Sequence, residues 1–556
     1  MRATSSLCLL GMAIAVGCST GATETDDDST AGSPTGGGSS DASSSTGSSA
    51  GGMGPSSSNS SSSSVAAGGA GQGSGGDGGA GQGGDGGAGV GGSGVGGSGV
   101  GGSGGGGAVA GDALWAQGFG DAELDVGRDV GVASNGDIFV TGFFEGTIDF
   151  GGTQLTSMGE DDMFVARLDS DGVVDWARSF GDGGLSGGYQ LAVDGNDDIV
   201  IVGQFTGGLD FGGVSDGIAA TSDGTGEQFD TFVAKLDGDD GDGIWARVFV
   251  VNSEFDDPHG IAVDSNGDVV FVGEYSGTVD FGSGETLTSA QEGNTIFVQA
   301  YVAKLDGSNG MAVFAQGFEG DAPQVPFSVA TAGQDIVVGG SWEGTIEFDP
   351  GTEVDALDGL DGFVVKLNQN GVHQWEQIFN TADTQFVVPE AVAVDSGGNV
   401  IVAGGYTGNV DFGGGAENAG NASDAFIVKF DAAGNFLWDA TFGDGSNQSA
   451  ATLSTDDQDD IIIAGVYEGV IDLGDGDLAN PEVTTRNVFI AKLGAANGAH
   501  LWSNGYGDAD DQLLGACASD DDEAYCIGTL LGEMDFDVAT VTSAGNSDAW
   551  LAQLAK

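Results

Sequence analysis

The 556-residue chain has few basic residues and few histidines. It contains 12 Lys and Arg and 3 His against 84 Asp and Glu, giving a formal net charge of −72 at pH 7. So negative a surface repels nucleic acid and anionic lipid headgroups, which excludes DNA- and RNA-binding functions. The histidines, His259, His373 and His500, are scattered, so we expect no histidine-based zinc site. Two explanations of the acidity stay open: solubility in a saline environment, or collection of Ca²⁺ by carboxylates.

Long apolar runs are absent outside the first seventeen residues. That segment has Arg2, an apolar stretch from Leu7 to Val16 that is too short to span a bilayer, and Gly17 directly before Cys18. This pattern predicts a signal peptide over 1–17. "AVGC" (15–18) resembles the lipobox of bacterial lipoproteins, although Ala15 stands where leucine is usual. The resemblance implies that Cys18 is acylated and becomes the new N-terminus.

The same resemblance predicts where the protein resides. Ser19, a non-acidic residue after the cysteine, implies an outer-membrane lipoprotein of the cell envelope, either periplasmic or exposed at the cell surface. Its contact with the membrane is then made through the lipid alone. An ordinary secretory signal, with Cys18 incidental, is the alternative.

Aromatic residues are missing from residues 18–111. The segment is built of strings such as "SSSNSSSSS" and "GVGGSGVGGSGVGGSG". Without apolar periodicity it cannot bury enough surface to offset the entropy of ordering, so we predict a disordered linker. About 92 flexible residues have an r.m.s. span on the order of 50 Å, which would hold a folded head away from a membrane.

Helical periodicity is missing from the remainder, 112–556, which instead repeats four landmarks seven times. In one copy they are an alternating strand "AVAVD" (391–395), a polar turn "SGGN" (396–399), an apolar run "VIVAGGYTGNVDFG" (400–413) and, after a loop, "FIVKFD" (426–431). A strand around an aromatic residue follows. Four antiparallel strands repeated seven times are typical of a β-propeller.

The order of the landmarks predicts how the ring closes. The chain begins with an isolated aromatic strand, "ALWAQGFGD" (113–121), and ends on "AWLAQLAK" (549–556), which lacks its fourth strand. We therefore expect an all-β, seven-bladed propeller over 112–556, in which the N-terminal strand completes the last blade. Closure leaves no long exposed sheet edge, and we expect a monomeric head.

These residues resemble the SBBP family, the seven-bladed bacterial β-propeller repeat. The shared pattern is D-x-x-G-N/D, then "VxVxG", then "DxFVAKL", then "xxGxxxW", over essentially all of 112–556. The resemblance implies the fold and a place outside the cytoplasm. It implies no reaction.

Two cysteines fall in the last repeat. Aligning "GACASDDDEAYCIGT" on "AVAVDSGGNVIVAGG" places Cys517 and Cys526 opposite each other across a hairpin. Directly opposed side chains have Cβ atoms about 4.5–5.5 Å apart, close enough for a disulfide. We predict that bond, with two buried free thiols as the alternative.

Residues that recur in nearly every repeat are interpreted as structural, because a catalytic residue needs to appear only once. Three series recur. The third strand carries a basic residue, with acids recurring in the "DFG" strings, and the fourth strand carries an aromatic residue expected to pack between blades. We assign no catalytic, cofactor-binding or metal-binding residue. The basic series is Arg167, Lys235, Lys304, Lys366, Lys429 and Lys492, broken by Gln553; the acids are Asp149, Asp210, Asp280, Glu347, Asp411, Asp472 and Asp535; the aromatics are Trp115, Trp176, Trp245, Phe314, Trp375, Trp438 and Trp502.

Loop lengths favour one face of the ring as a binding surface. The turns between first and second and between third and fourth strands are short and uniform, whereas the other connections vary and must lie on the opposite face. We therefore predict a non-enzymatic binding or scaffold module for a protein or glycan partner, needing no cofactor. The variable segments are 212–230, 250–258, 282–299, 349–361, 380–389 and 413–424.

Two other functions stay open. The segment 234–246, "AKLDGDDGDGIWA", resembles the tryptophan-docking hairpins of quinoprotein propellers, which would make the chain an enzyme. Asp-rich turns such as "DSNGD" (264–268) would suit a Ca²⁺-dependent adhesin, although none has the full spacing of a calcium loop.

Overall fold

The computed structural model describes residues 109–556, except 213–218, 222–228, 251–255, 293–294, 358, 382–384, 481–484 and 521–522. The proposed signal peptide, Cys18 and nearly all of the linker lie outside the described residues. The described part contains 42 β-strands and no helix, and so no helix that could cross a membrane.

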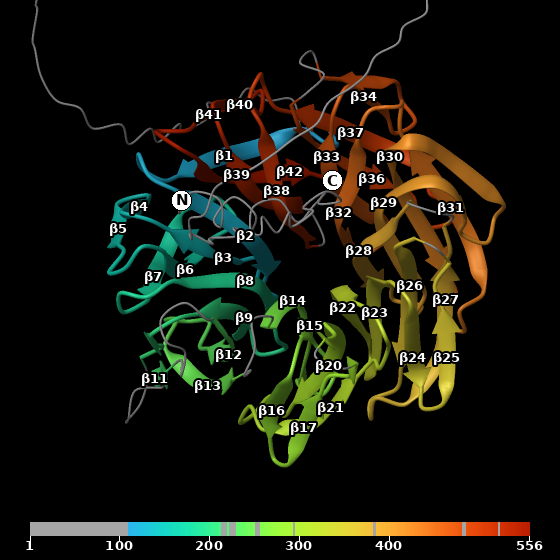
Figure 1. Cartoon of the computed structure of the whole chain (residues 1–556). Helices are drawn as coiled ribbons and strands as arrows, with labels where there is room; N and C mark the ends of the chain where they lie inside the picture. The colour runs from blue at the N-terminus through green and yellow to red at the C-terminus, as the bar shows by residue number, and fades with distance from the viewer. Residues whose placement is uncertain are drawn as a thin grey trace, which may run out of the picture. The chain divides into compact units, whose positions relative to one another are not determined.

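Seven four-stranded antiparallel sheets form the blades (Figure 1). Blades 1 to 3 are β2 (Asp125–Val132), β3 (Ile138–Phe144), β6 (Asp162–Leu168) and β7 (Val174–Phe180); β8 (Ser186–Val193), β9 (Ile199–Phe205), β12 (Asp230–Leu236) and β13 (Gly243–Phe249); and β14 (Asp256–Val263), β15 (Val269–Tyr275), β20 (Gln299–Leu305) and β21 (Ala312–Gly317). Blades 4 and 5 are β22 (Gln324–Ala332), β23 (Asp335–Trp342), β26 (Asp361–Leu367) and β27 (His373–Phe379); and β28 (Val387–Val394), β29 (Val400–Asp411), β30 (Ala416–Phe430) and β31 (Phe436–Phe442). Blade 6 is β32 (Gln448–Thr455), β33 (Ile461–Tyr467), β36 (Asn487–Leu493) and β37 (His500–Tyr506), and blade 7 is β38 (Gln512–Ser519), β39 (Glu523–Leu530), β42 (Asp548–Ala555) and β1 (Ala113–Phe119).

The ring closes as predicted, because β1 pairs with β42 as the outermost strand of blade 7. Ala113 lies opposite Leu554 and Phe119 opposite Ala549, and the Ala555 amide donates to the Asp112 carbonyl at 2.9 Å. The first strands of successive blades pack against one another all the way round, β38 against β2 included. These strands lie nearest the centre in Figure 1. Together they form a seven-bladed β-propeller.

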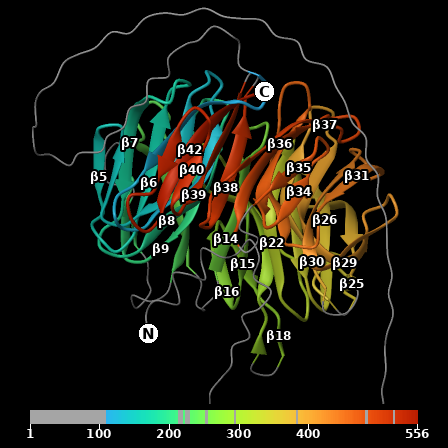
Figure 2. The ribbon, with the colours of Figure 1, turned by 90° about the horizontal axis from the view of Figure 1, so that it is seen from above.

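The second and third strands form the buried interior of each blade. Their β-branched and aromatic residues are buried along the whole strand, as in β9 and β12, and they pack against the neighbouring blade rather than within one sheet. Seven apolar clusters therefore join the blades in sequence. Figure 2 shows the blades side by side, with β18 extending beyond one face of the ring.

The "DFG" segments differ from the prediction. They continue the second strand only in β29; in the other six blades they start a separate two-stranded hairpin. The described hairpins pack against the outermost strand of a blade, and the Phe211 carbonyl accepts from the Gly243 amide at the start of β13. Much of the second-to-third connection thus covers the rim. The hairpins are β4–β5 (Thr147–Phe150, Thr153–Thr156), β10–β11 (Gly208–Asp210, Ala219–Thr221), β16–β17 (Thr278–Gly282, Glu285–Thr288), β24–β25 (Thr345–Asp349, Thr352–Asp355), β34–β35 (Val470–Asp472, Asp477–Ala479) and β40–β41 (Glu533–Asp535, Thr540–Thr542), with β18–β19 (Gln291–Glu292, Thr295–Ile296) in addition.

The buried residue that follows the acid of each string explains this geometry; it is phenylalanine in six blades and Leu473 in blade 6. Phe150 is buried against Phe119 and Phe164, with ring centroids 4.9 and 5.2 Å apart, and Phe412 packs on Phe426 at 4.5 Å. Burial of a phenylalanine or leucine side chain contributes about 1.5–3 kcal/mol, so this residue fixes its segment to the blade. Six of the seven repeats carry a phenylalanine at this position.

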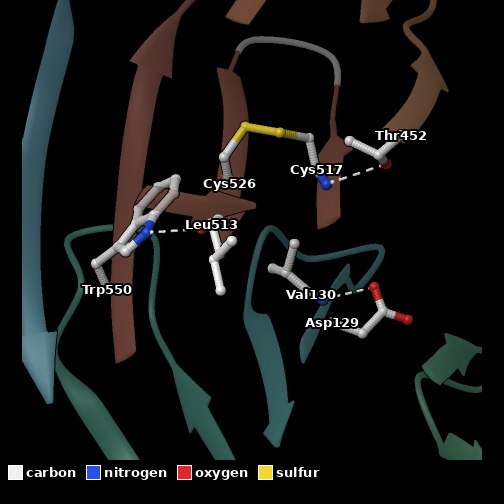
Figure 3. The surroundings of a disulfide bond; sticks show 7 residues. All are labelled: Asp129, Val130, Thr452, Leu513, Cys517, Cys526 and Trp550. Carbon is white, nitrogen blue, oxygen red and sulfur yellow. Dashed lines mark hydrogen bonds between the residues drawn. A yellow bond between two sulfur atoms is a disulfide. The ribbon is translucent and has the colours of Figure 1, made fainter. Parts of the chain in front are cut away.

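The structure joins Cys517 and Cys526 by a disulfide (Figure 3). The two residues are directly paired across β38 and β39, with Cα atoms 4.2 Å apart, and both are buried. The Cys517 amide also donates to Thr452 Oγ1 of blade 6 at 3.3 Å. The bond therefore lies in the blade that closes the ring and beside its contact with the preceding blade.

Removal of this disulfide is expected to lower the free energy of unfolding by about 2–3 kcal/mol, because it closes a loop with a sequence separation of 9 residues. Urea unfolding of the C517S/C526S double variant, compared with the wild type with and without reductant, measures the loss. The wild type in reductant should match the variant. An unfolding midpoint that is insensitive to both changes would show that the bond adds no stability.

Two buried carboxylates meet where the ring closes. Asp125 of β2 and Asp548 of β42 lie on either side of Gly120, where a Cβ atom would come within 2.6 Å of Asp548 Cγ and 2.7 Å of Asp125 Oδ2. In each carboxylate Oδ1 has no hydrogen-bond partner among the described residues. Burial, opposed by the Asp121 amide and reinforced by the charge of Asp548, raises the pKa of Asp125 to about 8.

Asp125→Asn is expected to stabilise the protein at pH 8 and not at pH 4. An acid whose pKa is raised in the folded state loses stability as the pH rises from its unfolded value near 4 to about 8, and no further above that. Asparagine removes this loss while keeping an acceptor for the Asp121 amide. The difference from wild type should grow across that window to about 1–3 kcal/mol. Thermal unfolding at several pH values checks it; a difference independent of pH would contradict it.

Candidate functional site

The repeated basic residues of the third strand form ion pairs within their own blades. Lys235, Lys304, Lys429 and Lys492 each place Nζ within 2.6–2.8 Å of an aspartate. The partners follow the first strand of the blade, at Asp194, Asp264, Asp395 and Asp456. Arg167 pairs with Asp137, and Lys366 with Asp335 at 3.4 Å. The structural interpretation is thus supported by direct contacts.

The acids of the "DFG" strings are not these partners. They accept hydrogen bonds from amides of their own turns: Asp149 from Gly152, Asp280 from Gly282 and Glu347 from Gly351. The side chains instead stabilise the tight hairpin turns, which asparagine and aspartate do commonly. The acids and the bases thus recur at separate points of the blade, and blade 7 has Gln553 in place of the base.

The basic residues also reach the next blade. Arg167 donates to the Gly238 carbonyl at 2.8 Å and Lys429 to the Ala495 carbonyl at 3.1 Å. Burial alone would raise the pKa of Asp194, Asp395 and Asp456, but the hydrogen bond and charge of the lysine hold it below its ordinary value. Aspartates of the Asp-rich turns therefore form ion pairs with lysines. Among the described residues, no group of three or more His, Cys, Asp or Glu is placed to hold a metal ion.

The aromatic series packs between blades, as expected, and has a glycine partner in each case. Each ring lies against a positive-φ glycine in the following blade, where a Cβ atom would clash or crowd with the ring; the pairs are Trp115–Gly172, Trp176–Gly241, Trp245–Gly310, Phe314–Gly371, Trp375–Gly434, Trp438–Gly498 and Trp502–Gly111. Five indoles also donate to a carbonyl of that turn, as Trp245 does to Gly307 at 3.0 Å. The last pair is the ring closure itself, since Gly111 precedes β1.

Besides a register shift between the third and fourth strands, each blade has one between its first and second strands. In every blade the first strand has a β-bulge, with one extra residue opposite the second strand; the seven extra residues are Arg128, Tyr189, His259, Phe327, Glu390, Ala451 and Gly515. All seven are half-buried. The first strands lie nearest the centre of the ring, so each bulge belongs to the innermost strand of its blade. We refer to them as the axial ring.

The repeated glycine of the second strand permits each bulge. A Cβ atom at Gly142, Gly404 or Gly465 would come within 1.8–2.0 Å of a backbone oxygen of the first strand. Gly203, Gly273, Gly340 and Gly528 have the same close approach, at 2.0–2.6 Å. The "VxVxG" glycine is thus required by the backbone at this level, while the bulged side chain is free to vary.

Ring members of neighbouring blades contact each other between blades 1 and 2 and between blades 3 and 4, and blades 2 and 3 are linked through Gln204 and Asp257 beside the ring. The Arg128 guanidinium lies 5.5 Å from the Phe143 ring centroid and 5.3 Å from that of Tyr189. The Tyr189 hydroxyl donates to Gln204 Oε1 at 3.1 Å, and Gln204 Nε2 donates to Asp257 Oδ1 at 2.7 Å. The His259 and Phe327 rings are 6.0 Å apart. Blades 6 and 7 contribute only Ala451 and Gly515.

Titratable groups of the axial ring have displaced pKa values. Burial lowers the pKa of His259 to about 4 against the opposing charge of Asp257, and raises that of Tyr189 to about 12. Burial raises the pKa of Glu390 to about 8, against a hydrogen bond from Ser449. Such shifts gather at functional sites because binding and catalysis use desolvated polar groups.

Sequence reasoning missed the axial ring because it followed what recurs. The position that could have been noticed is one that varies: it holds a different residue in each of the seven repeats. It follows a small residue, a proline or a leucine in the first strand, and the second strand of every repeat has a glycine opposite it. Of the variable segments, 282–299 and 413–424 are largely described, and parts of 212–230, 250–258, 349–361 and 380–389 lie outside the described residues.

No family model matches the chain, and no curated protein does. It is similar to several solved structures. BamB from Moraxella catarrhalis is 9% identical, with a TM-score of 0.30, over 77% of this chain and 99% of its own. The quinohemoprotein alcohol dehydrogenase from Comamonas testosteroni is 10% identical, with a TM-score of 0.37, over 79% and 76%. A streptogramin B lyase structure is 10% identical, with a TM-score of 0.33, over 79% and 97%. Likenesses this distant carry no argument about function, and the fold rests on the strand pairing.

Proposed function

We propose that the chain is a lipid-anchored, exported propeller that binds a partner without catalysing a reaction. The observation that carries this proposal is the axial ring. Seven backbone-equivalent positions hold seven different side chains, whereas the residues that recur are used in ion pairs, glycine contacts and turn caps. A surface that varies on a constant scaffold is typical of binding proteins.

The partner would meet the face at which the first strands begin. Each bulge lies in the first half of its strand, near the blade-linking loop, and the parts of the variable connections that do not cover the rim return to the same face. Exposed residues on this face include Glu123, Met158 and Glu160, and the exposed Leu357 holds the position in blade 4 that Met158 holds in blade 1. A protein partner resting there could extend a side chain toward the axis, and this combination favours a protein over a glycan.

Capture from envelope extracts tests the proposal, with the full-length protein purified in detergent as bait. Wild type should retain a partner, and the charge reversals Glu123→Lys and Glu160→Lys together should reduce retention at least tenfold. The matched control Asp171→Lys reverses an equally exposed acid on the opposite face and should have no effect. No retained partner with wild type, or equal loss with the control variant, would contradict the proposal.

Cys18→Ser is expected to release the protein from the membrane. Acyl chains contribute about 0.8 kcal/mol per buried CH₂, so loss of a multiply acylated cysteine removes the only membrane contact proposed for the chain. Fractionation of cells into soluble and membrane pools, with mass spectrometry of the mature N-terminus, measures the change. The disulfide supports an oxidising compartment outside the cytoplasm. Continued membrane association of the variant would contradict lipid anchoring through Cys18.

A further inference from the structure

One turn of blade 1 lacks a carboxylate that four other blades have. In those four blades the residue after the first strand is an aspartate, whose Oδ1 accepts from two amides of the following turn and whose Oδ2 lies 2.6–2.8 Å from the third-strand lysine. The corresponding residue of blade 1 is Ala133. The four aspartates are Asp194, Asp264, Asp395 and Asp456.

The backbone of this turn is the same with and without the aspartate. In blade 1 the Ala133 amide donates to the Asp137 carbonyl at 2.8 Å. In blade 3 the Asp264 amide makes the same bond to the Asp268 carbonyl at 2.9 Å. Blades 4 and 7 differ, because the blade 4 turn is one residue shorter and Gln553 replaces the base in blade 7. Alanine in blade 1 therefore removes the carboxylate and leaves the turn around it in place.

The first donor left without an acceptor is a backbone amide. In blade 3 the Asn266 amide donates to Asp264 Oδ1 at 2.8 Å, whereas the equivalent Asn135 amide has no acceptor among the described residues. The Asn135 side chain compensates in part, because its Oδ1 accepts from the Asp137 amide at 3.0 Å. One of the two amides that an aspartate would bind is thus still available in blade 1.

The second donor belongs to the base of the third strand, Arg167. Its Nε and Nη2 donate to Asp137, and its Nη1 donates to the Gly238 carbonyl at 2.8 Å. Nη1 also lies 3.4 Å from Oδ1 of Asp239, an aspartate whose side chain is 97% exposed. A guanidinium has five N–H groups, so one on Nη2 has no acceptor in the part of the chain that the structure describes.

A cavity of about 170 Å³ lies at this place, between the turns of blades 1 and 2. The Arg167 guanidinium carbon lies 5.9 Å from the Phe139 ring centroid, so a cation–π contact holds the guanidinium at the wall. A water molecule needs only about 10–15 Å³ of such space, so the cavity has room for a ligand of several heavy atoms. Its lining includes Ala133, Asn135, Phe139, Arg167, Asp197 and Asp239.

The other blades show that a carboxylate is stable in such surroundings. In blade 2 Asp194 is 6% exposed beside a second acid of the turn, Asp198, and Lys235 lies 2.6 and 3.2 Å from the two. Burial raises the pKa of Asp194, but the lysine and the turn amides hold it below its ordinary value. Blade 1 has the same second acid, Asp137, and a base with one N–H group available. The position can therefore bind a carboxylate that the chain itself does not supply.

The remaining polar groups of the lining are mostly acceptors. Asp197, Asp198 and Asp239 of blade 2 face the same cavity with carboxylate oxygens. Hydroxyl groups can donate hydrogen bonds to carboxylates, whereas a simple anion cannot. A ligand that carries both a carboxylate and hydroxyl groups thus matches the donors of blade 1 and the acceptors of blade 2.

We propose that this cavity binds a small hydroxylated carboxylate, such as a sugar acid. Its carboxylate takes the place that Asp264 occupies in blade 3, accepting from the Asn135 amide and Arg167 Nη2, and its hydroxyl groups donate to the carboxylates of blade 2. The cavity is formed by the short turns, on the face opposite the proposed partner surface. The site therefore goes beyond the proposed function and does not depend on it.

Isothermal titration calorimetry of the full-length protein in detergent, at constant ionic strength, tests the proposal. The probes are sodium glucuronate, its uncharged methyl ester, and sodium acetate, which has a carboxylate and no hydroxyl group. We expect glucuronate to bind saturably at one site per chain and at least fivefold more tightly than acetate. The methyl ester should bind at least tenfold more weakly than glucuronate, because it lacks the charge that Arg167 binds.

The variant Ala133→Asp places the chain's own carboxylate in the cavity, as in the four other blades. It should weaken glucuronate binding at least tenfold. Its melting temperature should be no lower than that of wild type, because the new carboxylate can accept from Asn135 and Arg167, so loss of binding cannot be attributed to unfolding. The matched control is Ala332→Asp, which adds an acid at the equivalent position of the shorter turn in blade 4 and should leave the affinity unchanged.

Four results would overturn the proposal. They are the absence of saturable glucuronate binding to wild type, wild-type affinity in A133D, equal binding of the methyl ester, and an equal loss of affinity in A332D. Equal affinities for acetate and glucuronate would overturn the assignment of a hydroxylated ligand. Each of these results leaves partner binding on the opposite face untouched, so a failure here is distinct from a failure of the proposed function.

Discussion

Deletion of residues 112–121 is expected to abolish cooperative folding of the propeller. The segment contains β1, which is the fourth strand of blade 7, and its removal exposes the whole edge of β42. Phe119 is 3% exposed and packs in the apolar cluster between blades 7 and 1, so loss of this side chain alone should lower the free energy of unfolding by about 3–5 kcal/mol. Typical domains have a total stability of only about 5–15 kcal/mol.

β1 also contributes to two contacts between blades. Trp502 of blade 6 stacks on Gly111 directly before the strand, and Asn504 donates to the Gly111 carbonyl at 2.5 Å. Trp115 within the strand donates to the Ser170 carbonyl of blade 1 at 3.1 Å and covers Gly172. One short strand therefore connects blades 6, 7 and 1. Its loss should open the ring, which is more than the loss of one edge strand from a sheet.

A rearranged chain provides the matched control for this deletion. β1 runs antiparallel to β42, and the Gly111 amide donates to the Ala555 carbonyl, so the end of the chain lies beside the start of the strand. Moving 109–121 behind Lys556 through a short glycine-containing turn should restore a single cooperative transition in urea. A deletion variant that unfolds with unchanged midpoint and slope would show that closure by β1 adds nothing to stability.

The ring and its closure could be predicted from the sequence because both depend on the strand patterns that recur in the seven repeats. Seven copies of four strand patterns, with one aromatic strand displaced from the end to the beginning, leave few topologies other than a closed propeller. The opposed pair Cys517–Cys526 followed from the same alignment, since the repeat supplies the register. Local pattern and global fold agree here, which is the condition for predicting one from the other.

Contacts between repeats could not be predicted in the same way. The pairing of Lys304 with Asp264 rather than with Asp280 depends on which turn lies beneath the third strand, and spacing does not give this. The "DFG" hairpins turn along the rim because Phe281 is buried against Phe249 and Phe271, a tertiary contact. The axial ring depends on a backbone bulge whose extra residue is different in every copy. A search for residues that recur in every repeat does not detect a position whose residue differs in each of them.

The third-strand lysines let the two kinds of ion pair be compared within one scaffold. Lys304 Nζ lies 2.6 Å from Asp264 Oδ2, with side chains 3% and 0% exposed. Lys366 occupies the same position in blade 4, but it lies 3.4 Å from Asp335, whose side chain is 40% exposed. Breaking a buried pair leaves an uncompensated charge in the interior, whereas an exposed partner is solvated by water.

Lys304→Met is therefore expected to lower the free energy of unfolding by about 3–5 kcal/mol, and Lys366→Met by no more than about 1 kcal/mol. Urea denaturation of both variants measures the difference. The double variant Lys304→Met with Asp264→Asn should recover most of the loss, because asparagine keeps an acceptor for the Asn266 amide and removes the unpaired charge. Equal losses in the two single variants would mean that the lysine stem, rather than its charge, stabilises the blade. Recovery in the double variant would assign the loss to the isolated Asp264 carboxylate, and with it the reason that six of seven blades keep a base at this position.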